Sequence, residues 1–202
     1  RPYIRELLKE MIPLKKWWLT QASMDIAKDP ELLDLMKASG CIGVFLGIES
    51  VNDKILESMG KGINFKTTEK CLELFDSVQL DYAASFTIGH PGETKGSMKQ
   101  TIDFAKKLAR KGIGVGLYLV TPYPGTYLYD ISKANGWIKS DDWDSFDQLA
   151  DKDSVYAYDT WTPETLTKFY RLAWKELDVS RVMGKILNFK FISKELLRLN
   201  SI

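Results

Sequence analysis

An unbroken apolar run at residues 41–48, Cys-Ile-Gly-Val-Phe-Leu-Gly-Ile, most limits what this chain can fold into. A strand that is apolar at every position has both faces covered, which is typical of a parallel sheet flanked by helices. Three other segments are typical of strands, and a helical pattern follows each; the expected strands are 16–23, 41–48, 81–88 and 115–121. This repeat predicts a parallel α/β fold, either a sector of a barrel or an open doubly wound sheet.

Several of the expected helices have clear start signals. Asp29 and Pro30 are typical of an N-cap and a first helical residue, Thr94 can cap a helix over 95–110, and Thr162-Pro163 begins another that runs to about Leu177. Further helices are expected at 1–11, 52–59, 66–78, 126–133 and 181–199. The last is cationic and apolar; packing on the barrel is favoured over a membrane-surface role.

Charge and cysteine usage exclude several classes of function. Lys plus Arg is 28 and Asp plus Glu is 27, which gives no electrostatic case for binding nucleic acid or a membrane surface. No apolar run approaches the roughly 20 residues of a transmembrane helix, and no signal peptide is recognisable. Cys41, Cys71 and the single histidine, His90, form no metal-ligand spacing, so no metal ligand is assigned and both cysteines are expected to be buried. We expect a cytoplasmic protein, and the missing initiator Met favours a piece of a longer chain.

Polar residues gather where the expected strands end. Parallel α/β folds bind ligands beyond the carboxyl ends of their strands. There the chain has Gln21 and Ser23, Glu49 and Ser50, His90 and Glu93, and Thr121 and Tyr123. This predicts a binding face without identifying its ligand. Glu49 or Ser50 could instead cap the next helix, residues 89–92 could be an ordinary turn that exposes backbone groups, and His90 is more typical of a rim residue than of a general base.

Four motifs, taken in order, resemble one enzyme family. Residues 45–50 (FLGIES) with 54–62 (KILESMGKG), and 86–94 (FTIGHPGET), resemble the fourth and fifth barrel units of radical S-adenosylmethionine (SAM) enzymes. Residues 29–41 resemble the third unit, and 123–126 (YPGT) resemble the end of the sixth. The similarity covers about residues 17–129. It is strongest to the cobalamin-dependent branch, which includes the anaerobic magnesium-protoporphyrin IX monomethyl ester cyclases and many radical methylases.

The resemblance implies a fold and a chemistry. The fold would be a partial TIM-like barrel, four βα units of a (βα)6 barrel over 1–140, with a helical C-terminal extension over 141–202. The family binds SAM and a 4Fe-4S cluster, and some members bind cobalamin through an upstream domain. The cluster cleaves SAM reductively to a radical that abstracts hydrogen from a small-molecule substrate. The parent protein would therefore be a radical SAM oxidoreductase or transferase.

The same resemblance assigns roles to residues. Glu49 and Ser50 would contact the ribose or methionine part of SAM, and Gln21 and Ser23 would lie near its methionine end. The backbone of Ile88-Gly89 and of Leu119-Val120 would hold the adenine. His90, which replaces the apolar residue usual in this turn, and Tyr123 would lie on the substrate side.

Two departures limit what the chain can do alone. The CxxxCxxC loop that holds the family's cluster does not occur, and the only Gly-Glu pair is Gly92-Glu93, not the second-unit motif that receives the SAM amino group. The chain therefore resembles the C-terminal part of the catalytic domain and is expected to be inactive by itself. The alternative is a complete, cluster-free α/β domain that binds a nucleotide or a partner protein.

A half-barrel is also expected to associate. The edge of the strand at 17–23 would be unpaired, and an apolar barrel lining of Val44, Leu46, Phe86 and Leu119 would lose its cover. Trp17, Trp18 and Tyr118 are expected in the core rather than in a pocket wall. We expect a homo-oligomer joined through the open edge, unless helices within 162–199 fold back over the opening.

Overall fold

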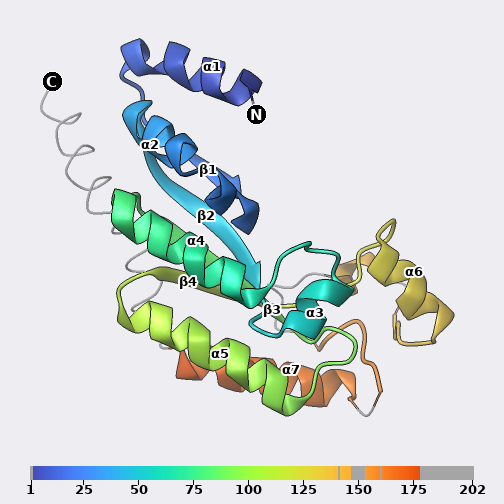
Figure 1. Ribbon diagram of the computed structural model, residues 1–202. Helices are drawn as coiled ribbons and strands as arrows, with labels where there is room; N and C mark the ends of the chain where they lie inside the picture. The colour runs from blue at the N-terminus through green and yellow to red at the C-terminus, as the bar shows by residue number, and fades with distance from the viewer. Residues whose placement is uncertain (1, 141, 147–152, 160, 178–202) are drawn as a thin grey trace, which may run out of the picture.

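A computed structural model describes residues 2–140, 142–146, 153–159 and 161–177 (Figure 1). Four strands form one parallel sheet in the order β1-β2-β3-β4: β1 (Trp18–Ala22), β2 (Cys41–Glu49), β3 (Tyr82–Ile88) and β4 (Gly114–Leu119). This confirms the predicted parallel α/β architecture. Within the described residues the sheet is open, with β1 and β4 at its edges.

Helices connect the strands. In chain order they are α1 (Pro2–Met11), η1 (Ile12–Leu14), η2 (Met24–Lys28), α2 (Pro30–Ala38), α3 (Asp53–Ser58), α4 (Phe65–Val78), α5 (Lys95–Arg110), α6 (Tyr127–Ala134), η3 (Trp143–Phe146) and α7 (Pro163–Glu176). Figure 1 shows α2, α4 and α5 in a row against one face of the sheet. The helix expected at 181–199 lies outside the described residues.

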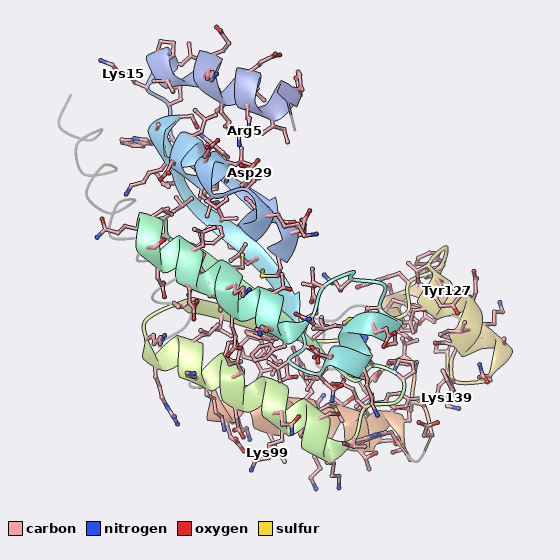
Figure 2. The ribbon with its side chains drawn as sticks, viewed as in Figure 1. Arg5, Lys15, Asp29, Lys99, Tyr127 and Lys139 are labelled. Carbon is pink, nitrogen blue, oxygen red and sulfur yellow. The ribbon has the colours of Figure 1, made fainter. Side chains whose placement is uncertain are left out.

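Two of the three helix caps that the sequence predicts are formed by side chains in the structure. Thr94 Oγ1 accepts from the Ser97 N–H at the start of α5, and Thr162 Oγ1 accepts from the Thr165 N–H at the start of α7. Asp29 is an exception, because its side chain makes no capping bond to α2 and instead pairs with Arg5 of α1 (Figure 2). The ion pair ties α1 to α2 and explains why a good capping residue is used differently here.

The hydrophobic core lies between the sheet and its helices. Val44, Leu46, Phe86 and Leu119 are buried there, so the prediction that they line an exposed barrel interior is wrong. The opposite face of the sheet, which we call the open face, carries Leu19 (42% exposed), Phe45 (37%), Ser85, Thr87 and Tyr118 (39%). The alternation of side chains in a strand fixes two sets of residues, but β2 is apolar in both, so its sequence does not say which set meets the helices.

The predictions for the cysteines and for three aromatic residues are confirmed in part. Cys41 and Cys71 are buried, as predicted. Trp18 packs against the core, and its indole N–H donates to the Ser39 carbonyl. Trp17 (49% exposed) and Tyr118 are not core residues, so that prediction is wrong for both.

The described C-terminal segments share the core of the sheet. Tyr156 and Tyr158 are buried in it, and Tyr156 forms an antiparallel bridge with Ile138. Helix α7 lies beside α5 (Figure 1), and the Tyr170 hydroxyl donates to the Leu117 carbonyl of β4 at 3.2 Å. The short helix η3 lies in an acidic and aromatic stretch that includes Asp142 and Asp144. No helix in the described ranges is long and apolar enough to cross a membrane.

Candidate active site

Glu49, at the end of β2, is the carboxylate that the fold presents on the open face. Its φ of 68° is left-handed, and the register between β2 and β3 shifts between Gly47 and Glu49. The side chain of Glu49 folds back over Gly47. A Cβ placed on Gly47 would lie only 2.7 Å from Glu49 Oε1. The Glu49 carboxylate thus occupies space that a side chain at position 47 would fill, and any residue larger than glycine there would displace the carboxylate.

Two neighbours fix the two oxygens of that carboxylate. Lys61 Nζ lies 3.1 Å from Oε1, and the Thr87 hydroxyl donates to Oε2 at 3.3 Å. Lys61 reaches the site from the glycine-rich turn after α3, whereas Thr87 stands on the neighbouring strand β3. A carboxylate between an ammonium and a hydroxyl stays in one orientation, and it keeps lone pairs for a further donor.

His90 continues this line of polar groups away from the open face. Its Nε2 is 2.7 Å from Thr87 Oγ1, and the residue is 8% exposed. Burial and the positive charge of Lys61 lower the pKa of His90 from 6.5 to about 4. The ring is therefore neutral at physiological pH, and its low pKa makes it a weak base.

Glu93 holds the turn that follows β3. Its Oε2 accepts from the backbone N–H groups of Gly89 at 2.8 Å and of His90 at 2.9 Å, while its buried Oε1 has no hydrogen-bond partner among the described residues. Burial raises the pKa of Glu93 to about 7, although the two backbone bonds oppose the shift. The Tyr156 hydroxyl donates to the Gly89 carbonyl, and that of Tyr158 donates to the Glu93 carbonyl at 3.3 Å.

Several residues predicted to touch SAM have polar groups that the protein itself engages. Ser50 is fully buried, and its hydroxyl lies 3.3 Å from Thr101 Oγ1 of α5. The same hydroxyl accepts from the backbone N–H of Asn52, and the side chain of Asn52 caps α3. The Ile88 carbonyl accepts from the Val120 N–H at 2.9 Å, and Gly89 gives its N–H to Glu93. The N–H groups of Gly89 and His90 and the carbonyl of Gly89, at the start of the turn, are therefore already hydrogen-bonded within the protein. Leu119 is buried beside Gly89.

The remaining predicted residues lie around the rim. Gln21 and Ser23, at the end of β1, are exposed, and the Ser23 hydroxyl donates to the Asp25 carboxylate. Tyr123 follows β4, is exposed, and donates its hydroxyl to the Phe146 carbonyl at 3.2 Å. Glu49 and His90 thus meet through Thr87, whereas the contacts described for Gln21, Ser23 and Tyr123 do not reach Glu49 or His90.

Among the residues around Glu49 and His90, the sequence gives Lys61 and Thr87 no role, and it places Glu93 only on the predicted binding face. For Thr87 a signal was available, because Ser85 and Thr87 alternate with the apolar residues of β3 and mark a face that helices do not cover. Lys61 stands between two glycines, which suggests only the end of a helix. From the sequence, Glu93 is expected to be a carboxylate at the rim of the sheet. Its burial depends on Tyr156 and Tyr158, which lie far along the chain.

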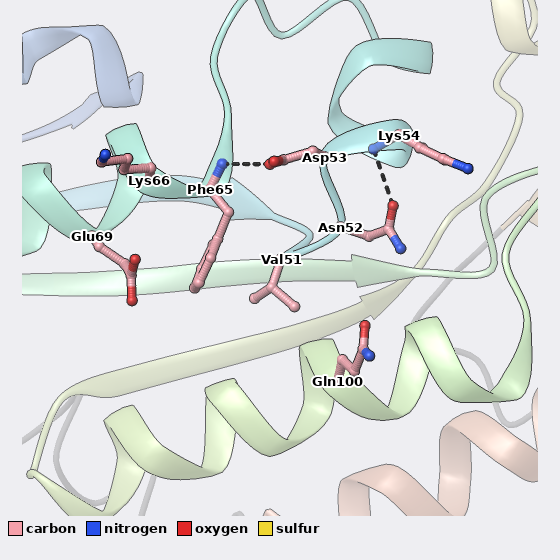
Figure 3. Close-up of a pocket in the computed structure, with 8 residues that line it drawn as sticks. All are labelled: Val51, Asn52, Asp53, Lys54, Phe65, Lys66, Glu69 and Gln100. Carbon is pink, nitrogen blue, oxygen red and sulfur yellow. Dashed lines mark hydrogen bonds between the residues drawn. The ribbon is translucent and has the colours of Figure 1, made fainter.

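A separate hollow of about 640 Å³ lies between α3, α4 and α5 (Figure 3). Asn52 and Asp53 line it, but their carbonyl and carboxylate oxygens accept from the backbone N–H groups of Lys54 and Phe65. None of the residues predicted from the sequence to bind a ligand lines this hollow. It lies among the helices and not on the open face, so we do not assign the site to it.

Comparison with known proteins identifies the family. The family model of the radical SAM superfamily matches residues 1–105, which is just over half of the 202 residues. An uncharacterized methyltransferase, PH0819 of Pyrococcus horikoshii, is 35% identical over 69% of this chain and 29% of its own length. The bacteriochlorophyllide d C-12(1)-methyltransferase of Chlorobaculum tepidum is 31% identical over 72% of this chain and 31% of its own length. The chain thus spans less than a third of these relatives.

Two further matches bear on the predicted branch and fold. An anaerobic magnesium-protoporphyrin IX monomethyl ester cyclase of Cereibacter sphaeroides is 24% identical over 63% of this chain and 21% of its own length, which confirms the resemblance to that branch. The radical SAM methyltransferase TsrM of Kitasatospora setae, solved with tryptophan and a SAM analog bound, superposes with a TM-score of 0.53 at 22% identity, over 67% of this chain and 28% of TsrM. This match supports the fold, a part of a TIM-like barrel. The chain belongs to the radical SAM superfamily.

Proposed function

We propose that this chain is part of a longer radical SAM enzyme, of the methyltransferase or cyclase kind, and that the open face of its sheet forms part of the SAM site. The family match and the names of the relatives support the kind of enzyme. The small share of those relatives that the chain spans supports the view that other segments complete the enzyme. Nothing in these matches supports the alternative, a cluster-free nucleotide-binding or partner-binding domain.

The observation that carries the proposal is the Glu49 carboxylate, held on the open face by Lys61 and Thr87. A carboxylate accepts hydrogen bonds from ribose hydroxyls and from an ammonium group, and SAM offers both. When bound, SAM supplies the sulfonium whose bonds the family's chemistry breaks. The chain's own part is to orient the molecule through Glu49. For Ser50 and Gly89 the structure describes internal hydrogen bonds, so their contacts with SAM are not part of the proposal.

The family's iron-sulfur cluster does not fit the residues of this chain. Cys41 and Cys71 are buried in β2 and α4, and no three His, Cys, Asp or Glu side chains among the described residues form a metal-binding group. We propose that the cluster ligands, and a cobalamin domain if there is one, belong to segments outside these 202 residues. Iron and sulfide added anaerobically to the isolated chain should leave no stoichiometric cluster and no SAM cleavage.

The substrate is proposed to be a small molecule that approaches from the side of Tyr123, which is exposed at the rim. Two of the relatives are named for tetrapyrrole substrates, so a flat, aromatic substrate is the first to test. His90 was placed on the substrate side by the resemblance, but it is buried behind Thr87. We also propose a cytoplasmic location, because Cys41 and Cys71 form no disulfide with each other.

The test measures SAM affinity in the longer enzyme by equilibrium dialysis. Glu49→Ala should weaken SAM binding by about 1–3 kcal/mol, the usual cost of leaving hydrogen-bond partners of a charged group unpaired. Gly47→Ala should also weaken it, because its new Cβ would displace the carboxylate. Glu57→Gln, on the exposed side of α3, removes a charge away from the open face and is the control. Equal SAM affinity in Glu49→Ala and Glu57→Gln would contradict the assignment of Glu49 as a SAM contact.

A further inference from the structure

The single histidine of the chain stands at the inner end of a line of hydrogen-bonding groups. His90 Nε2 lies 2.7 Å from Thr87 Oγ1, and Thr87 Oγ1 lies 3.3 Å from Glu49 Oε2. The backbone N–H of His90 is fixed by Glu93, and the residue is buried. The direction in which hydrogens are donated along this line decides whether Glu49 is held or released.

The donors can be assigned by counting hydrogens. A threonine hydroxyl has one hydrogen to donate, and an ionised carboxylate can only accept. Glu49 forms an ion pair with Lys61, whose Nζ lies 3.1 Å from Oε1, and Thr87 donates its hydrogen to Oε2. The contact between Thr87 and His90 is then a hydrogen bond only if the ring donates, which places a hydrogen on Nε2.

The opposite tautomer would break the line. With the hydrogen on Nδ1, the bare Nε2 would accept the Thr87 hydrogen, and Glu49 Oε2 would lose its donor. Of the two described side-chain partners of the Glu49 carboxylate, Lys61 alone would then remain. The strand ladder does not fix this carboxylate, so its direction depends on Lys61 and Thr87.

We infer that His90 is a positioning residue, whose neutral Nε2–H form holds the Thr87 hydroxyl on Glu49 and so aims this carboxylate at SAM across the open face. The inference rests on the proposed function for Glu49. His90 itself touches neither SAM nor substrate. The role gives a reason for a polar residue in a turn where an apolar one would pack equally well.

The tautomer is measured by NMR on the 202-residue chain, labelled with ¹⁵N-histidine and carrying no histidine tag. Because the chain has one histidine, its ring signals need no assignment. We expect a hydrogen on Nε2 and none on Nδ1. Thr87→Val should shift the Nε2–H resonance, whereas Thr87→Ser should preserve it. A hydrogen on Nδ1, or an Nε2–H resonance that Thr87→Val leaves unchanged, would overturn the inference.

The positioning role is tested by SAM binding in the longer enzyme. His90→Phe removes the donor but keeps the volume of the ring, and should weaken SAM binding about fivefold, as expected for one lost hydrogen bond. His90→Gln restores an N–H donor near the position of Nε2 and should bind within about twofold of the parent. Circular dichroism of both variants checks that they fold.

The outcomes separate this inference from the proposed function. If Glu49→Ala weakens SAM binding while His90→Phe and His90→Gln bind alike, the SAM contact stands and the positioning role is overturned. If Glu49→Ala leaves the affinity unchanged, the SAM contact and the positioning role both fail, whatever the tautomer. Weakening by Glu49→Ala and His90→Phe, with recovery in His90→Gln, supports both.

Discussion

His90 and Glu93 are buried neighbours whose pKa values move in opposite directions. Burial raises the pKa of Glu93 from 4.5 to about 7 and lowers that of His90 from 6.5 to about 4. In both cases the folded protein favours the uncharged form, because a charge would lie in a poorly solvated turn. At neutral pH the turn therefore carries a neutral imidazole and a carboxyl group near its midpoint.

The two residues should give opposite pH dependences of stability. Between pH 4.5 and about 7 the folded state keeps the Glu93 proton that the unfolded state has lost, so the free energy of unfolding falls as pH rises. Between about pH 4 and 6.5 the unfolded state binds a proton at His90 that the folded state does not, so the free energy of unfolding rises with pH. In the unmodified protein these effects offset each other over much of this range.

Single substitutions should reveal each of these two pH dependences of the free energy of unfolding. Glu93→Gln should leave a stability that rises with pH, and His90→Phe one that falls, each by up to about 1.4 kcal/mol per pH unit. Urea unfolding at several pH values measures both slopes, and the double variant gives the contribution of other groups. Identical pH profiles in the two single variants would contradict the assignment of these shifts.

At the scale of elements, α5 begins directly after the turn that Glu93 holds. Thr94 and Ser97 form a reciprocal capping box, in which the Thr94 side chain accepts from the Ser97 N–H and the Ser97 hydroxyl accepts from the Thr94 N–H. The cap satisfies backbone donors that the first helical turn leaves free. It therefore fixes the helix start next to His90 and Glu93.

Loss of this cap should destabilise the chain without changing the open face. Thr94→Ala should lower the free energy of unfolding by about 1 kcal/mol, whereas Thr94→Ser should keep most of it, since serine caps equally well. Chemical denaturation measures the difference. If Thr94→Ala and Thr94→Ser were equally stable, the capping bond would contribute nothing.

At the scale of the whole molecule, the described helices cover the sheet unequally. Helices α2, α4 and α5 cover one face, and α7 reaches β4 through Tyr170 (Figure 1). On the other face Leu19, Phe45 and Tyr118 remain partly exposed, and β1 has no strand partner on its outer side within the described part of the chain. Such an edge and apolar surface favour association.

The isolated chain is therefore predicted to form a homodimer or a larger oligomer through the open side of the sheet. Light scattering at several concentrations measures its mass, and Phe45→Ser should shift the population towards monomer by removing apolar area from the open face. Tyr127→Ser, which changes an exposed aromatic residue on α6, is the control. A monomer at all concentrations would contradict the prediction.

The sequence by itself determined the features that depend on neighbours in the chain. The spacing of apolar residues predicts the strands and helices, Thr94 and Thr162 mark helix starts, and residues 45–50 and 86–94 carry the family resemblance. These signals are local, so they can be interpreted without knowing where distant segments lie. They placed Glu49 and His90 near the same rim.

Only the tertiary structure decided which groups are exposed and which are paired. Glu49 and Ser50 are adjacent in sequence, yet Glu49 lies on the open face and Ser50 is buried against Thr101 of α5. Glu93 is a buried acid because Tyr156 and Tyr158 close over its turn. Burial and partners depend on contacts between distant residues, and a strand that is apolar on both faces cannot specify which face the helices will cover.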